Sequence, residues 1–130
     1  MRNDILRKPL GLEISSKQLQ NEKNENYNHF VAVDNNIVIS ALSVCTRQNY
    51  NQLCQIATAK RYRRKGIGKN LVLYAEKLLS RIDNLKVFLV FSRINSIGFY
   101  QNCGYDIVDS EIYELVGLEH RKMSKILLNT

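Results

Sequence analysis

The sequence predicts a layered domain of the α/β or α+β class, formed by a chain of 130 residues. The expected elements follow the order strand–strand–strand–helix–strand–helix–strand–strand, with helical material in front, and such a mixture forms layers around one core. Apolar residues make up 45% of the chain and are spread along its whole length, which is typical of a globular protein. The length suits one domain over residues 1–130 and leaves little room for a second.

The first half of the chain is expected to contain a short helix followed by three strands. Ser15 can cap a helix that runs to about residue 23, because a hydroxyl accepts hydrogen bonds from the free amides of a helix start. Strands at 29–33 and 37–44 flank the Asx-rich turn 34–36, whose residues tolerate the backbone angles of tight turns. A third strand is expected at 52–58.

The second half contains the strongest helix signal. Over residues 66–82, apolar side chains recur at spacings of three and four, which places them on one helix face. Residues 87–91 are five apolar residues in a row, which favours a strand buried on both faces. A short helix is expected at 96–103, because Gly104 is a favoured helix stop. Two final strands are expected at 105–109 and at about 120–127.

The composition limits the partners and the compartment. The net charge is +7, with its densest run at residues 60–65, and it favours a phosphate, a nucleic acid or an anionic surface without choosing among them. The three cysteines are odd in number and lie in apolar or element-like stretches, which favours a reducing, cytoplasmic setting over a disulfide framework. No run reaches the ~18 apolar residues of a membrane span and no signal peptide is visible, so we expect no membrane partner.

A glycine-containing turn at residues 63–68 leads from the third strand into the long helix. Gly66 and Gly68 let the backbone turn sharply with N–H groups exposed, and the helix start adds unpaired donors and a partial positive charge. These features predict a phosphate or pyrophosphate site, with a plain strand-to-helix turn as the alternative. The Walker A spacing is absent, and Leu71 stands where a Rossmann fingerprint requires its third glycine.

Several motifs resemble those of one enzyme family. Residues 63–68, Arg-Arg-Lys-Gly-Ile-Gly, match the Arg/Gln-x-x-Gly-x-Gly/Ala signature of GNAT acetyltransferases, and residues 99–105 resemble their Phe-Tyr-x-x-x-Gly-Phe/Tyr segment. Residues 117–123 resemble the tail of the ElaA-like branch, and residues 6–11 resemble the start of related sequences. The resemblance covers residues 28–125 well. It implies a mixed, mostly antiparallel sheet flanked by helices, with splayed central strands.

The resemblance implies acetyl-coenzyme A as the cofactor and implies no metal. The turn amides would hold the pyrophosphate, and the end of the third strand would pair with the pantetheine arm. Arg93 and Ser96 stand where the family usually has Asn and Ala, and Arg93 either reaches a cofactor phosphate or lies on the surface. The cofactor-binding residues carried over are Ile56, Ala57, Thr58, Arg63, Arg64, Lys65, Gly66, Ile67, Gly68, Lys69, Arg93, Ser96 and Tyr100.

The catalytic residues are also implied by the resemblance. Tyr100 matches the position of a tyrosine general acid, which would protonate the departing thiolate; the alternative is a core residue on a helix face. Gln52 stands where some members have a glutamate base, and an amide cannot take that proton. His120 is the best titratable candidate for the base or for a substrate contact. Weaker candidates are Glu111, Glu114, Glu119 and water.

Three function classes follow. The first is an N-acetyltransferase that moves an acetyl group directly to an amine of a small molecule or peptide. The second is a non-catalytic acyl-coenzyme A sensor, favoured by Gln52 and by the short N-terminal segment. The third is a nucleic-acid-binding protein, disfavoured because Tyr62 is the only aromatic residue in the basic run. A Cys103–His120 nucleophile pair is conceivable, but buried cysteines are usually apolar fillers.

The N-terminal segment departs most from the family pattern. The part before residue 28 is short, and the usual first strand is missing or atypical. Because the early helices of the family help to wall the substrate pocket, the short segment leaves open whether that wall is complete. A second subunit could supply it, so a homodimer is one expected assembly.

Overall fold

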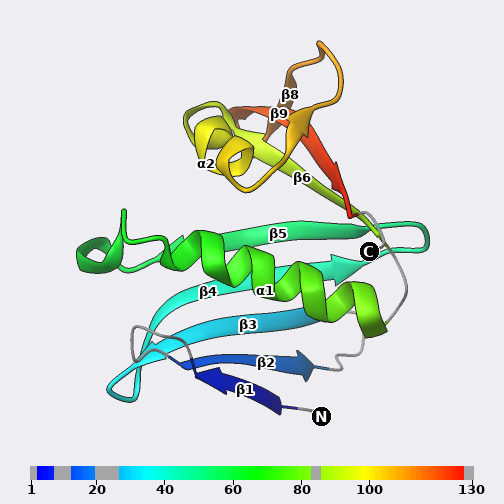
Figure 1. The fold of residues 1–130 in the computed structure, drawn as a ribbon. Helices are drawn as coiled ribbons and strands as arrows, with labels where there is room; N and C mark the ends of the chain where they lie inside the picture. The colour runs from blue at the N-terminus through cyan, green and yellow to red at the C-terminus, as the bar shows by residue number, and fades with distance from the viewer. Residues whose placement is uncertain (1–2, 8–12, 20–26, 83–85, 128–130) are drawn as a thin grey trace.

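The computed structural model describes residues 3–7, 13–19, 27–82 and 86–127 (Figure 1). Within these ranges the chain forms nine strands, two α-helices and two short 3-10 helices. The strands are β1 Asn3–Arg7, β2 Glu13–Leu19, β3 Tyr27–Asp34, β4 Ile37–Thr46, β5 Asn51–Thr58, β6 Val87–Arg93, β7 Asp106–Ile107, β8 Tyr113–Leu115 and β9 Leu118–Ile126. The helices are η1 Lys60–Tyr62, α1 Ile67–Ile82, η2 Ile94–Ser96 and α2 Ile97–Asn102.

All described strands belong to one mixed sheet. Its order is β1-β2-β3-β4-β5-β6-β9-β7, and β8 pairs with β9 off this path. The β5–β6 pair is parallel, and every other described pair is antiparallel. The parallel pair requires a crossover, and α1 provides it between β5 and β6. The predicted mixed, mostly antiparallel sheet flanked by helices is confirmed.

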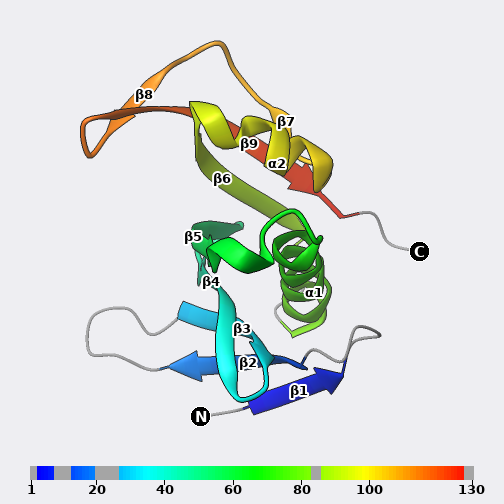
Figure 2. The ribbon, with the colours of Figure 1, turned by 90° about the vertical axis from the view of Figure 1, so that its left-hand side faces the viewer.

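The two central strands separate after a short stretch of pairing. The parallel ladder ends at Leu53 and Val90, although β5 continues to Thr58 and β6 to Arg93. Cys54 is the extra residue of a bulge between β4 and β5, because Val44 pairs with Leu53 while the preceding β4 residue pairs with the residue after Cys54. A bulge bends its strand and ends regular pairing. Figures 1 and 2 show the resulting divergence of β5 from β6, which confirms the predicted splay.

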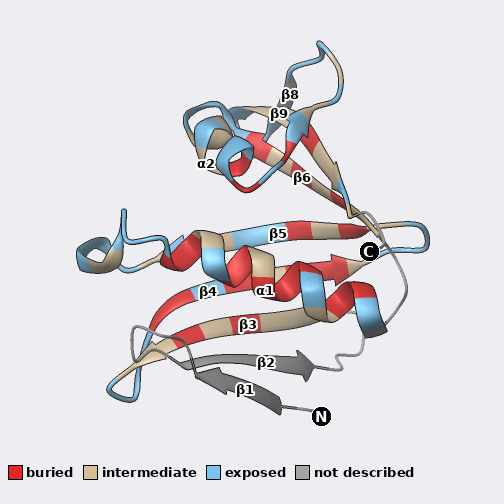
Figure 3. Cartoon of the chain, viewed as in Figure 1, coloured by how far each residue is buried: buried red, intermediate tan, exposed pale blue. Residues whose placement is uncertain are grey.

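The core lies between α1 and one face of β3, β4 and β5, and it continues into β6, α2 and β9 (Figure 3). The helix buries its apolar face at three- and four-residue spacing, as its sequence predicted, and it covers residues 67–82 of the expected 66–82. Phe30 of β3 meets the ring of Tyr74 edge-on, with 6.0 Å between ring centroids. The helix residues buried in this core include Ile67, Leu71, Val72, Ala75 and Leu79.

The N-terminal segment differs from expectation. Residues 13–19 form the strand β2, paired antiparallel with β3 and β1, whereas a helix from Ser15 was predicted. A hydroxyl near a helix start is a local signal, and long-range strand pairing overrides it. Residues 20–23 of that helix lie outside the described residues. Two strands precede β3, so a first strand is not missing, and no described residue before β3 is helical.

The second half differs in two places. The run 87–91 does form strand β6, but its burial alternates: Phe88, Val90 and Ser92 are buried, and the other face is half-buried. On that other face Phe91 packs edge-on against Tyr113, with 5.2 Å between ring centroids. An additional hairpin, β8–β9, was not predicted, because no Asx-Gly pair marks the turn between these strands.

Candidate functional site

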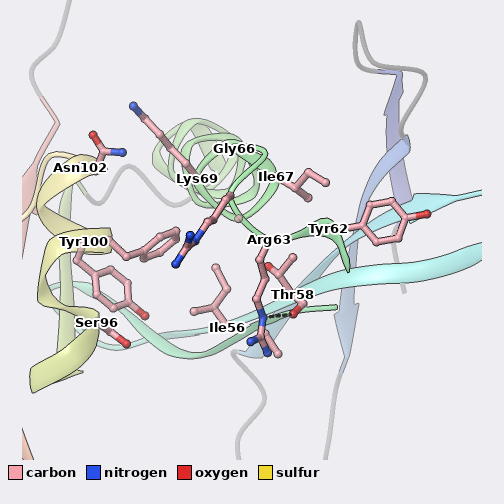
Figure 4. Close-up of a pocket in the computed structure, with 14 residues that line it drawn as sticks. Ile56, Thr58, Tyr62, Arg63, Gly66, Ile67, Lys69, Ser96, Tyr100 and Asn102 are labelled. Carbon is pink, nitrogen blue, oxygen red and sulfur yellow. Dashed lines mark hydrogen bonds between the residues drawn. The ribbon is translucent and has the colours of Figure 1, made fainter. Parts of the chain in front are cut away.

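A cleft of about 580 Å³ opens at the splay (Figure 4). One side comes from the end of β5, the following turn and the start of α1, and the other comes from η2 and α2. The cleft therefore joins two parts of the chain that are about thirty residues apart in sequence. Its lining residues are Ile56, Ala57, Thr58, Tyr62, Arg63, Arg64, Gly66, Ile67, Gly68, Lys69, Ser96, Phe99, Tyr100 and Asn102.

The turn at the start of α1 presents free amides. Asn70 donates from its backbone N–H to the Gly66 carbonyl at 3.0 Å, as the first hydrogen bond of the helical turn. The amides of Ile67, Gly68 and Lys69 precede that bond and have no partner within the helix. Arg64 and Gly66 adopt left-handed backbone with φ of 63° and 77°, which shapes the turn. Such an arrangement suits an anion of the phosphate type.

The two glycines are needed for different reasons. Gly66 has open space around it, so its role is its positive φ, which side chains disfavour. Gly68 has no such φ, but a Cβ there would lie 3.3 Å from Phe99 Cε1 and 3.4 Å from Thr58 Oγ1. The missing side chain lets the start of α1 lie close to both Thr58 of β5 and Phe99 of α2.

Three cations line one side of the cleft. Arg63, Arg64 and Lys69 line it, and no described lining residue is acidic. Arg63 Nε also donates to the Thr58 carbonyl at 3.0 Å, which ties the basic turn to the end of β5. An anion in the cleft would therefore meet three cations and no opposing carboxylate among these residues.

Tyr62 anchors the loop that carries these cations. Its hydroxyl donates to Asp34 Oδ2 at 2.7 Å, which joins η1 to the β3–β4 hairpin, and this bond raises the pKa of the phenol above its ordinary value. The Arg61 guanidinium and the Lys65 ammonium lie 5.7 and 5.8 Å from its ring centroid. Lys65, predicted as a cofactor contact, does not line the cleft.

The end of β5 is fixed on one edge and unpaired with β6 on the other. Ser40 Oγ donates to the Ala57 carbonyl at 3.1 Å and lies 2.9 Å from Thr58 Oγ1, and the Ala59 amide donates to Ile39 O at 2.7 Å. Beyond Leu53, β5 has no ladder partner on β6. A free strand edge of this kind can pair with an extended chain that carries amides.

Tyr100 points from α2 toward Ile56 of β5 (Figure 4). The side chain is 7% exposed, its ring lies edge-on to Phe99 and Tyr105, and its hydroxyl makes no hydrogen bond to a described residue. Burial, with a smaller effect of the Cys103 thiol, raises the pKa of Tyr100 to about 12. At neutral pH the side chain is therefore a protonated donor that faces the cleft.

His120 and Arg93 do not line the cleft. They are register partners at the end of β6, and Tyr113 of β8 pairs with His120 on its other side. His120 Nδ1 lies 2.9 Å from the Leu118 carbonyl. The weaker base candidates are exposed and belong to the β7–β8 loop and the β8–β9 hairpin, outside the cleft: Glu111, Glu114 and Glu119.

The Cys103–His120 pair is not joined by a hydrogen bond in the described structure. Burial, with the nearby Glu76 carboxylate, raises the pKa of Cys103 to about 11, so the group is a thiol at neutral pH. Gln52 lies on β5 beside Cys45 and Leu89, before the splay.

The cleft also contains three residues that sequence analysis did not assign to it: Tyr62, Phe99 and Asn102. Phe99 belongs to the matched motif and Tyr62 lies within the basic run, so the sequence offered a reason to assign both residues to the cleft. Nothing in the sequence marks Asn102.

Comparison with known proteins points to one family. Residues 8–127 match the family model described as an acetyltransferase (GNAT) domain. A Bacillus subtilis (strain 168) protein named as an acetyltransferase is 28% identical over 97 residues, which cover 75% of this chain and 65% of that protein. The chain thus spans slightly less than two thirds of this relative.

Solved structures share the fold. The PaiA N-acetyltransferase of Thermoplasma acidophilum, solved with coenzyme A, has a TM-score of 0.67 and 23% identity, covering 78% of this chain and 62% of its own. Escherichia coli ElaA has a TM-score of 0.67 and 16% identity, covering 76% and 67%. Among the described helices, none is both long enough and apolar enough to cross a membrane.

Proposed function

The chain belongs to the GNAT acetyltransferase family, and from that premise we propose that it transfers the acetyl group of acetyl-coenzyme A directly to an amine of a small molecule or a peptide. One observation carries the proposal: the turn amides of α1 and the hydroxyl of Tyr100 line the same cleft from opposite sides of the splay. The turn amides suit the phosphates of the acyl donor, and the Tyr100 hydroxyl suits its thioester end.

The residues present fit the pyrophosphate of coenzyme A. The amides of Ile67, Gly68 and Lys69 supply donors, and the helix start supplies a partial positive charge. Arg63, Arg64 and Lys69 add full charges. We assign the pyrophosphate to this turn, with Lys65 acting at longer range through its charge.

The end of β5 fits the pantetheine arm. Ile56, Ala57 and Thr58 line the cleft where β5 has left β6, so their strand edge is available to an extended amide chain. Ser96 lines the opposite wall of the cleft and would face the pantetheine arm. The arm would then lead from the phosphate turn toward Tyr100.

Tyr100 is assigned as the general acid. When bound, acetyl-coenzyme A supplies an acetyl thioester that a neutral amine attacks directly. With its pKa near 12, Tyr100 keeps its proton throughout the neutral range and can give it to the sulfur as the thiolate departs. The cleft holds the reactants in position, which is a large part of catalysis in a direct transfer.

The proton of the amine has no carboxylate or imidazole to receive it among the described lining residues. We therefore assign to water the proton that the nitrogen loses after the neutral amine has attacked the thioester. His120, paired with Arg93 at the end of β6, is retained as a candidate for contact with the acceptor.

The alternative function is a non-catalytic acyl-coenzyme A sensor, and the absence of a base among the described lining residues favours it. We propose a reducing, cytoplasmic setting, with which the three free cysteines are compatible. A homodimer could complete the acceptor wall, since no described residue before β3 is helical.

One experiment separates the enzyme from the sensor. Purified protein is incubated with acetyl-coenzyme A and a panel of amines and peptides with free amino groups, and thiol release and acetylated products are measured. Acetylated product above the rate without protein supports the enzyme. Binding of coenzyme A by calorimetry with no product from any amine class supports the sensor.

A further inference from the structure

A partly buried ion pair joins the two halves of the sheet that the splay separates. Glu76 lies on α1 and is 2% exposed, and the Lys125 ammonium of β9 donates to its Oε1 at 2.8 Å. Tyr105, which follows α2, donates from its hydroxyl to Glu76 Oε2 at 2.6 Å. Both carboxylate oxygens are therefore held by residues from the other side of the splay.

The same cluster holds the end of the helix that carries Tyr100. Lys125 donates a second hydrogen bond to the Cys103 carbonyl, directly after α2, at 2.8 Å. The Tyr105 amide donates to the Tyr100 carbonyl at 2.9 Å, and the two rings meet edge-on with 6.0 Å between centroids. Any displacement of Lys125 or Tyr105 would therefore be passed to Tyr100.

The position of Glu76 connects this cluster to the cofactor turn. Glu76 belongs to the same continuous helix whose first amides line the cleft. A helix is rigid over this length, so the contacts of Glu76 set where α2 lies relative to the turn. Removing one partner of a buried ion pair leaves an uncompensated charge, whereas the pair itself adds little net stability. Because the pair adds little net stability, we expect Glu76 and Lys125 to act by positioning α1 and α2 rather than by stabilising the fold.

We propose that Lys125 and Glu76 are positioning residues that set the distance between α1 and α2, and so place the Tyr100 hydroxyl opposite the cofactor turn. This inference rests on the proposed function in one respect, namely that Tyr100 is the acid. Neither residue lines the cleft, and both act through Tyr105 and the Cys103 carbonyl.

The test compares Lys125→Met with Lys77→Met, an exposed lysine of α1 that changes the net charge equally. In single-turnover assays Lys125→Met should slow the chemical step by about tenfold or more, because small misplacements of reacting groups are costly. The dissociation constant for coenzyme A should stay within about threefold, since the turn amides remain. Lys125→Arg should recover most of the rate, and Lys77→Met should behave as wild type.

A double-mutant cycle shows whether Lys125 acts through Tyr100. In a Tyr100→Phe background, Lys125→Met should have little further effect, because the group that it positions is gone. Equal effects of Lys125→Met in both backgrounds would overturn the proposal. If Lys125→Met does not fold, the cycle is run with the double variant Glu76→Gln/Lys125→Met, which buries no unpaired charge.

Failure of the proposed function is distinguished by a readout that needs no turnover. If wild type binds coenzyme A but acetylates no amine, hydrogen exchange of the α2 amides is compared in wild type, Lys77→Met and Lys125→Met. Exchange that is about tenfold faster in Lys125→Met supports the positioning role. Unchanged α2 exchange overturns it, whatever the fate of the catalytic assignment.

Discussion

Gly68 of α1 and the ring of Phe99 of α2 lie so close that a Cβ on Gly68 would stand 3.3 Å from Phe99 Cε1. This approach brings the two walls of the cleft together at the point where the turn of residues 63–68 enters α1. It explains why the second glycine of the turn cannot be larger, although its backbone angles are ordinary for a helix.

Gly68→Ala should therefore weaken coenzyme A binding by about tenfold, because Phe99 and Thr58 must move apart to admit the methyl group. The measurement is calorimetric titration with coenzyme A. Gly98→Ala in α2 is the control, since a Cβ there meets no atom within 4 Å. It should keep its affinity and gain roughly 0.5 kcal/mol of stability from helix propensity. Equal affinities for both variants would contradict the close-approach role of Gly68.

Replacing both Arg63 and Arg64 with Gln should weaken coenzyme A binding by about tenfold or more at low salt. The wild-type affinity should fall as salt is raised, and the variant should respond less, because both arginines act through phosphate charge. Arg81→Gln, at the exposed end of α1, is the charge control and should retain the wild-type salt response. A wild-type affinity that does not change with salt would rule out the electrostatic part of the account.

The sequence predicted the elements with local signals and missed those that depend on distant partners. The spacing of apolar residues by three and four predicted the helix 67–82, and the Asx residues predicted the β3–β4 turn. Strand β2 contains Ser15 and Ser16, which suggest a helix cap, and only its pairing with β3 makes it a strand. The bulge at Cys54, which creates the splay, has no local signature at all.

The candidate site was predicted through motif order rather than through geometry. The glycines, the helix start and the basic run predicted a phosphate site at the turn, and the resemblance assigned Tyr100. The structure brings both into one cleft. Lys65 and Arg93 were assigned by the same reasoning and lie outside its lining, since a cation in a motif can also turn toward a ring or a strand end. The Glu76–Lys125 pair spans 49 residues, and no spacing rule could have joined them.

Tyr100 should ionise well above the ordinary tyrosine range. The difference in ultraviolet absorbance titration between wild type and Tyr100→Phe should show a transition near pH 12, because burial disfavours the phenolate. A raised pKa in the folded state means that stability is fully present below pH ~10 and is lost as the pH rises toward 12. The wild type should therefore lose up to roughly 3 kcal/mol relative to Tyr100→Phe over that interval. A transition near pH 10 would show that the hydroxyl is open to solvent.

The most direct test of the account is the single-turnover rate of acetyl transfer by Tyr100→Phe, measured with any amine that the wild type acetylates. The substitution removes only the hydroxyl, so packing against Phe99 and Tyr105 is retained. We predict a rate about a hundredfold lower, with the dissociation constant for coenzyme A unchanged within about threefold. A chemical step at near wild-type rate would contradict the assignment of Tyr100 as the acid and would leave it a core residue of α2.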